Sequence, residues 1–217
     1  MTRRRILLLG GSFDPVHNGH VALGAYFTRL LHPDELRILP AGNPWQKQGL
    51  HASPAERVEM LRRAFMRQPA EIVIDQREIL RERPTYTIDT LRELRAELGP
   101  QASLAFVLGA DQLRQLDTWK EWRQLFDYAH LCAASRPGFA IDAGNLPADV
   151  AGEISRRAAT PDQIRNTPHG LAYLASNLAM DISASAIRAA LQRGERPQSL
   201  IPDGVLDYIE QHQLYKI

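Results

Sequence analysis

The sequence predicts a doubly wound α/β fold, in which helices cover both faces of a mostly parallel sheet. Five short apolar runs recur along the chain, and segments with helical spacing separate them. This alternation is typical of a parallel sheet whose strands are buried on both faces. A chain of 217 residues is long enough for one such domain with a substantial core and somewhat short for two, so we expect a single domain over residues 1–217.

The expected strands are the apolar runs themselves, and together they predict a Rossmann-like sheet. Capping residues mark several of the helices between them. Ser53, Pro54 and Glu56 combine a cap, a first-turn proline and a capping box. Gly99 and Gly194 are expected to end two later helices. The strands are expected at 6–9, 36–39, 72–74, 104–108 and 130–134, with 171–174 as a candidate sixth.

Composition restricts the classes of partner. The 26 Lys and Arg residues nearly balance the 25 Asp and Glu residues. The net charge of the chain therefore creates no strong electrostatic field that would indicate a nucleic-acid or membrane partner. The single cysteine, Cys132, cannot form an internal disulfide. The apolar run at 6–9 is shorter than the roughly 7 to 15 residues of an export signal, and no stretch approaches the ~18 residues of a membrane span. We therefore expect a cytoplasmic protein.

The stretch GGSFDPVHNGH, residues 10–20, follows the first expected strand. If that strand ends at Leu9 and a helix begins near Asn18, residues 10–17 are a loop at the carboxyl edge of the sheet, where ligands bind in doubly wound folds. A helix starting near Asn18 would direct unpaired N–H groups and its positive dipole end at a phosphate. His17 and His20 lie on one side of that helix start and can both donate to phosphate oxygens, while Gly19 leaves room for the ligand.

This stretch alone leaves other interpretations open. No Gly-Lys-Ser/Thr follows, which excludes a Walker loop, and the glycine spacing differs from the dinucleotide fingerprint. A zinc site would need a third and usually a fourth ligand, and Asp14 is the only further candidate ligand in this stretch. Otherwise the histidines are surface or capping residues beside a simple Asp14-Pro15 turn.

Two further helix starts carry polar groups. In SASAIR, Ser183 is the expected cap, and Ser185 and Arg188 share one face that could hold ATP phosphates. The alternative is an ordinary amphipathic helix with a solvated arginine. Gly109 ends an expected strand and Asp111 begins the next helix, where it could accept a bond from a ribose hydroxyl or simply favour the helix dipole.

Five motifs in this order and spacing resemble the nucleotidyltransferase superfamily with a His-x-Gly-His motif, in the form used by bacterial nicotinate-nucleotide adenylyltransferases. The motifs are GGSFDPVHNGH, PAGNPWQK at 40–47, RPTYTIDTL at 83–91, FVLGADQLRQLDTWKEW at 106–122 and DISASAIR at 181–188. The family usually has Ile-Ser-Ser-Thr-x-Ile-Arg in the last motif. Here Ala184 and Ser185 replace the second Ser and the Thr, so one hydroxyl is lost.

The resemblance implies an adenylyltransferase that converts nicotinate mononucleotide and ATP to deamido-NAD and pyrophosphate, with Mg²⁺ bound mainly through the phosphates. It implies catalytic roles for His17, His20 and Arg188. The ATP site would comprise Gly10, Gly11, Ser12, Phe13, His17, Gly19, His20, Gly109, Asp111, Ile182, Ser185 and Arg188. The mononucleotide site would comprise Lys47, Thr85, Tyr86, Trp119 and Arg136.

The mononucleotide residues also have plainer interpretations. Trp119, at an expected helix start, matches the family tryptophan that stacks on the pyridine ring, whereas Trp122 is expected in the core. Thr85 and Tyr86 match the segment that lines the nicotinate carboxylate pocket, although Thr87 as a helix cap could alone explain that segment. Lys47 matches a loop cation that reaches phosphate, but a loop lysine is usually solvated. No role is assigned to Trp45.

Alternative functions remain at this point. The acceptor could be nicotinamide mononucleotide or phosphopantetheine, since the chemistry is the same. A protein of another class, a nucleotide-binding sensor without turnover, could keep the same fold. The sequence leaves a homo-oligomer open.

Overall fold

The computed structural model describes residues 3–42, 50–66, 70–134, 146–175 and 182–216. Within these residues the chain forms one six-stranded sheet with the order β3-β2-β1-β4-β5-β6, and all neighbouring strands are parallel. The expected sheet, including its sixth strand, is confirmed. The strands are β1 (Arg5–Gly11), β2 (Glu35–Pro40), β3 (Glu71–Ile74), β4 (Ser103–Gly109), β5 (His130–Ala134) and β6 (Ala172–Ala175).

Helices cover both faces of this sheet, because successive side chains of a strand point to opposite faces. Leu7 and Leu9 of β1 belong to one buried cluster, and Ile6 and Leu8 belong to the other. The first cluster includes residues of α1 (Asn18–Leu31), α2 (Pro54–Phe65), α6 (Pro161–Asn166), α7 (Ala184–Gln192) and α8 (Asp203–Gln211). The second includes residues of α3 (Thr87–Leu98), α4 (Ala110–Leu113), η1 (Leu116–Thr118), η2 (Trp122–Asp127) and α5 (Ala148–Arg156).

The expected helix ends at capping residues are confirmed. The Ser53 Oγ accepts a bond from the Glu56 N–H at 3.3 Å, and the Glu56 carboxylate accepts from the Ser53 N–H at 2.6 Å. Gly99 follows α3 with φ +83°, and Gly194 lies just beyond α7 with φ +77°. These left-handed conformations explain why glycine occupies both positions.

Two local expectations are wrong. Trp119 does not begin a helix: it lies in extended backbone between the short 3₁₀ helices η1 and η2, and Glu121 takes a left-handed φ of +51° before η2. That conformation interrupts a continuous α-helix. Thr87 is not the cap of α3, because Tyr86 occupies the cap position and Thr87 is the first helical residue. The core position of Trp122 is confirmed.

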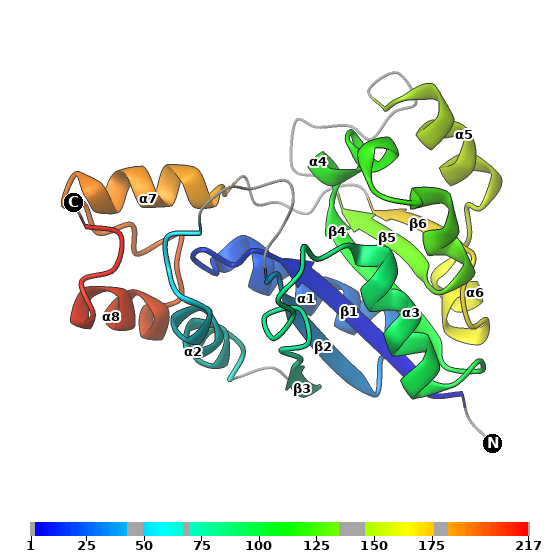
Figure 1. Ribbon diagram of the computed structural model, residues 1–217, viewed down its shortest axis with the longest axis horizontal. Coiled ribbons are helices and arrows are strands. Elements are labelled where there is room, and N and C mark those ends of the chain that lie inside the picture. The colour runs from blue at the N-terminus through cyan, green and yellow to red at the C-terminus, as the bar shows by residue number, and fades with distance from the viewer. Residues whose placement is uncertain (1–2, 43–49, 67–69, 135–145, 176–181, 217) are drawn as a thin grey trace.

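The strand order reverses at β1, which pairs with β2 on one side and β4 on the other. Leu9 of β1 lies opposite Val107 of β4, so Gly11 and Gly109 end their strands at the same edge of the sheet. A ligand crevice is expected at such a switch point. Helices α7 and α8 lie together at one end of the molecule, and α8 packs against α2 (Figure 1). Among the described helices, none is long and apolar enough to cross a membrane.

Candidate nucleotide-binding site

The two histidines of the 10–20 stretch form a stacked pair at the start of α1. His17 is the cap residue, and its backbone N–H donates to the Nδ1 of His20 at 3.2 Å. The ring centroids lie 3.7 Å apart, and the buried ring of Phe13 contacts the His20 ring edge-on at 4.8 Å. Because the Nδ1 of His20 is an acceptor, the neutral imidazole carries its proton on Nε2 and can donate from there.

Gly19 allows this pair to form beside the start of α7. A Cβ at Gly19 would lie 3.1 Å from the His17 ring and 3.6 Å from the Cβ of Ile182, the residue that precedes the α7 cap. A side chain at Gly19 would therefore push against the imidazole. The structure thus brings three expected site residues from both ends of the chain, His17, Gly19 and Ile182, to one place.

The end of β1 and the loop that follows it pack around aromatic rings. Gly10 and Gly11 were expected in the loop, but they are the last two residues of β1. A Cβ at Gly10 would lie 3.0 Å from the Phe106 ring, and one at Gly11 would lie 3.0 Å from the Phe13 ring. Phe13 is fully buried and adopts a left-handed φ of +49°. Since a bulky residue rarely takes this conformation, its surroundings must hold it there. Ser12 lies between Gly11 and Phe13 in this loop.

Arg188 of α7 contacts the same loop directly. Its Nη1 donates to the Asp14 carbonyl at 2.7 Å, joining residues 174 positions apart. The expected cap of α7 is confirmed, because the Ser183 Oγ accepts from the Ala186 N–H at 3.2 Å. Ser185 is exposed in the first turn. The start of α7 therefore lies against the loop between β1 and α1, which we call the signature loop. The exposed Ser185 supplies a hydroxyl there.

Asp14 fastens this loop to two distant segments. Its buried carboxylate accepts bonds from the backbone N–H groups of His51, at 2.8 Å, and Ala52, at 3.0 Å. It also accepts from the Tyr215 hydroxyl at 2.8 Å. Burial and the Asp14 charge raise the pKa of Tyr215, which keeps its hydroxyl protonated as a donor. Asp14 thus lies in the expected Asp14-Pro15 turn and is also a structural acceptor. No group of three potential metal-ligating side chains occurs in the described part of the chain.

Arg57 of α2 also supports this loop, and it is not among the residues expected from the sequence. Its side chain is fully buried, and its Nη1 donates to the carbonyls of Ser12, at 2.9 Å, and Ala41, at 2.7 Å. Burial lowers the pKa of this guanidinium. The helical spacing could have predicted its burial. Arg57 lies three and four residues before the apolar Met60 and Leu61, and hence on the buried face of its helix.

The expected ribose contacts lie at the end of β4. Gly109 caps the four-residue helix α4, and the exposed Asp111 lies in its first turn. A Cβ at Gly109 would lie only 2.5 Å from the Asp111 Oδ1. Glycine is therefore required for the carboxylate to fold back over the strand end.

The expected mononucleotide residues border the same edge. The Trp119 ring meets Phe106 edge-to-face at 6.5 Å, and its Nε1 is buried without an acceptor in the described part of the chain. Thr85 is buried, and Tyr86 caps α3 with the Lys120 Nζ 4.8 Å from its ring centroid. The remaining expected residues, Lys47 and Arg136, and the unassigned Trp45 lie outside the described residues.

Comparisons with known proteins show the family of this chain and its fold. The cytidylyltransferase-like family model matches residues 8–190. A probable nicotinate-nucleotide adenylyltransferase of Herminiimonas arsenicoxydans is 68% identical over 98% of this chain and 97% of its own length. Another, of Chromobacterium violaceum, is 43% identical over 98% and 99%. A solved structure of Plasmodium falciparum nicotinic acid mononucleotide adenylyltransferase complexed with NaAD, 20% identical, matches with a TM-score of 0.75 over 98% of both chains and supports the fold.

Proposed function

Because the chain belongs to the cytidylyltransferase-like family, and within it to the nicotinate-nucleotide adenylyltransferases, we propose that it transfers the adenylyl group of ATP to nicotinate mononucleotide. The products are deamido-NAD and pyrophosphate. The observation that carries this proposal is the stacked pair of His17 and His20 at the switch point, with α7 beside it. We further propose that residues 1–217 act as one nucleotidyltransferase domain in the cytoplasm.

The reaction is an in-line displacement at phosphorus. A phosphate oxygen of the mononucleotide attacks the α-phosphorus of ATP, and the bond from that phosphorus to the bridging oxygen of the β-phosphate breaks. Phosphate is already an anionic nucleophile near neutral pH, so neither a covalent residue nor a dedicated base is required. The protein contributes alignment and stabilisation of the charge on the α-phosphate.

In this proposal the signature loop and the start of α7 hold the phosphates. His17 and His20 donate to the α-phosphate, His20 through its Nε2–H. Ser185 and Arg188 hold the phosphate chain from the other side. The rings are fixed by stacking and by Phe13, so they need little reorganisation when charge develops. The remaining ATP contacts are assigned to Gly10, Gly11, Ser12, Phe13, Gly19, Gly109, Asp111 and Ile182.

The mononucleotide would lie between β4 and the start of α3. Trp119 stacks on the pyridine ring, a contact worth about 0.5 to 1.5 kcal/mol beyond buried area. The buried Nε1 of Trp119 supports a ligand here, because a buried donor without an acceptor is rare. Thr85 and Tyr86 bind the nicotinate carboxylate at the start of α3, where backbone N–H groups favour an anion. Lys47 and Arg136 are assigned to the substrate phosphate and the crevice.

Nucleotidyltransferases of this family generally use a divalent metal ion, and we assign Mg²⁺. We propose that this ion is carried mainly by the substrate phosphates and takes few ligands from the protein. Mg²⁺ keeps several waters and is commonly bound through phosphates and one or two carboxylates. It would neutralise charge on the ATP phosphates.

The test is pyrophosphate release from ATP and Mg²⁺ with nicotinate mononucleotide, nicotinamide mononucleotide or phosphopantetheine supplied in turn. We expect release with nicotinate mononucleotide many times faster than with the other two. Faster release with the amide would reassign the acceptor. No release with any acceptor, despite binding of ATP, would show a nucleotide-binding sensor instead.

A further inference from the structure

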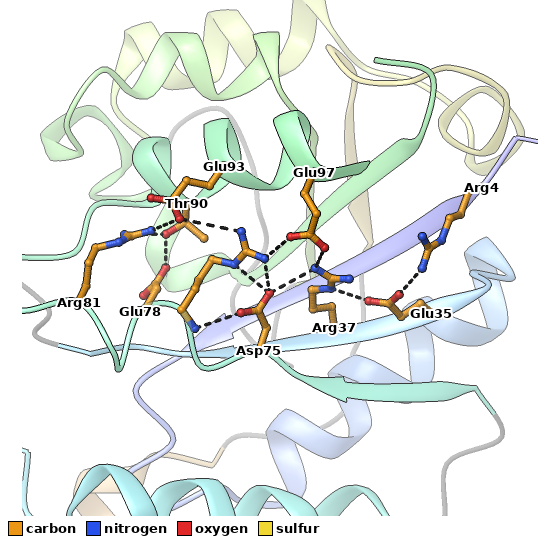
Figure 2. A network of polar contacts seen from close by, with 10 residues as sticks. Arg4, Glu35, Arg37, Asp75, Glu78, Arg81, Thr90, Glu93 and Glu97 are labelled. Atoms are coloured by element: carbon orange, nitrogen blue, oxygen red, sulfur yellow. Dashed lines mark hydrogen bonds and ion pairs between the residues drawn. The ribbon is translucent and has the colours of Figure 1, made fainter. Parts of the chain in front are cut away.

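A chain of charged and polar side chains lies between α3 and the strands β2 and β3, outside the site described above (Figure 2). It runs from the segment preceding β1 to the loop that precedes α3, and we call it the α3 network. Each member forms at least one hydrogen bond or ion pair with another. Its members are Arg4, Glu35, Arg37, Asp75, Arg77, Glu78, Arg81, Thr90, Glu93 and Glu97.

The end of the network on the strands is a set of ion pairs centred on Arg37. Its guanidinium donates to Glu35 at 2.5 Å and to Glu97 at 2.8 Å, and Arg4 also pairs with Glu35 at 2.8 Å. The Glu97 side chain is 45% exposed, which limits the contribution of its pairs. This end is far along the strands from the carboxyl edge where the site lies, since Glu35 begins β2.

The other end is a compact cluster on the loop. The Thr90 hydroxyl donates to the Glu78 carboxylate at 2.7 Å and accepts from the Arg81 Nη1 at 3.1 Å. The Thr90 hydroxyl thus acts both as a donor, with its single hydrogen, and as an acceptor. Thr90 is 1% exposed, and burial raises the pKa of Glu78. Breaking a buried hydrogen bond to a charged group costs more than breaking a solvated pair.

This cluster fixes the loop that carries two proposed substrate contacts. Glu78 and Arg81 lie in the turn before Thr85 and Tyr86, while Thr90 lies one helical turn after Tyr86 and donates its N–H to the Tyr86 carbonyl at 3.3 Å. The bond from Thr90 to Glu78 therefore closes the loop onto the first turn of α3.

The loop is also fixed from its opposite side. A Cβ at Gly42, just beyond β2, would lie 1.8 Å from the Glu78 carbonyl oxygen. The backbone at Glu78 is thus held between the end of β2 and α3, and a small movement of Glu78 would move the segment that leads to Tyr86.

We infer that Thr90 and Glu78 are positioning residues for nicotinate mononucleotide: the partly buried hydrogen bond between them sets the loop that presents Thr85 and Tyr86 to the substrate carboxylate. This inference rests on the proposed function. Neither side chain needs to touch the substrate. Losing their bond should weaken binding of the mononucleotide and leave ATP, which is held by α1 and α7, unaffected.

The test compares Thr90→Val, which removes the hydroxyl at nearly constant shape, with Thr90→Ser, which keeps it. For Thr90→Val we expect the KM for nicotinate mononucleotide to rise about tenfold, or about 1.4 kcal/mol, while kcat and the KM for ATP stay within about twofold. Thr90→Ser should be close to the parent. Glu97→Gln, at the strand end of the same network, should lower Tm without changing the KM for the mononucleotide.

Three results would overturn the inference while leaving the proposed function intact: an unchanged mononucleotide KM in Thr90→Val, an equal rise in the KM for ATP, or an equal effect of Glu97→Gln. If Thr90→Val does not fold, Glu78→Gln replaces it. That variant keeps an acceptor for Thr90 but removes the charge facing Arg81, and we expect a rise of about threefold; no rise overturns the inference. A parent protein that releases no pyrophosphate refutes the proposed function itself, and this inference with it.

Discussion

Acidification will destabilise the fold through His130, which begins β5 and is fully buried. The Leu171 N–H donates to its Nδ1 at 3.1 Å, so the neutral ring carries its proton on Nε2 and donates to the Thr167 carbonyl at 3.0 Å. Both nitrogens are thus used in one tautomer. A second proton on Nδ1 would face the Leu171 N–H, and burial already disfavours the charged ring.

Burial lowers the pKa of His130 from 6.5 to about 4, partly offset by the bond to Thr167. Between these two values the unfolded chain binds more protons at this site than the folded chain does. The free energy of unfolding therefore has its full contribution above about pH 6.5 and loses it as the pH falls toward 4. The difference corresponds to about 3 kcal/mol, a large part of the stability of an ordinary domain.

The measurement is urea denaturation of the parent and of His130→Gln at intervals from pH 4 to pH 7. The amide does not titrate, and carboxylates common to both proteins cancel in the comparison. The variant should be less stable at pH 7, and its disadvantage should shrink by about 3 kcal/mol on acidification. His212→Gln, at an exposed position, is the matched control and should follow the parent. Parallel curves for the parent and His130→Gln would refute the reasoning.

Three further predictions concern the site. His20→Ala should lower kcat by about 100-fold or more, or about 2.7 kcal/mol of transition-state stabilisation; a folded variant with the parent rate would remove His20 from catalysis. Trp119→Ala should mainly raise the Kd for nicotinate mononucleotide, measured by calorimetry, and an unchanged Kd contradicts stacking. Tyr215→Phe should lower the free energy of unfolding by about 1.5 kcal/mol in urea titrations, because its hydroxyl bonds a buried carboxylate. Tyr208→Phe, on α8, is the control for Tyr215, and equal losses in both would argue against the Asp14 bond.

The strands and helix ends were predictable because their signals are local. A buried parallel strand appears as an apolar run, and a capping box such as that of Ser53 and Glu56 involves residues three positions apart. The break at Trp119 was not predictable in this way. It depends on a left-handed Glu121, and glutamate has no intrinsic preference for that conformation.

The supports of the site were harder to predict than its motifs, because they join distant parts of the chain. Tyr215 and Asp14 are 201 residues apart, and Thr90 reaches Glu78 across a loop. A lone buried tyrosine or threonine carries no pattern that names its partner. Arg57 was the exception, since a charged residue on the apolar face of a helix indicates a buried acceptor nearby.

These supports would prepare the short stretch for its proposed role as a phosphate site. The loop between β1 and α1 is held by Arg57 from α2, by Arg188 from α7 and by Tyr215 from the C-terminal segment. These contacts bond the carbonyls of Ser12 and Asp14 and the Asp14 carboxylate within the folded chain itself. In the proposed function a phosphate would meet donors whose positions are already fixed, so charge stabilisation would need little reorganisation at the moment of reaction. The conformational entropy of the loop is thus lost when the chain folds and not when a ligand binds. The position of the stacked histidines depends on residues from both ends of the chain.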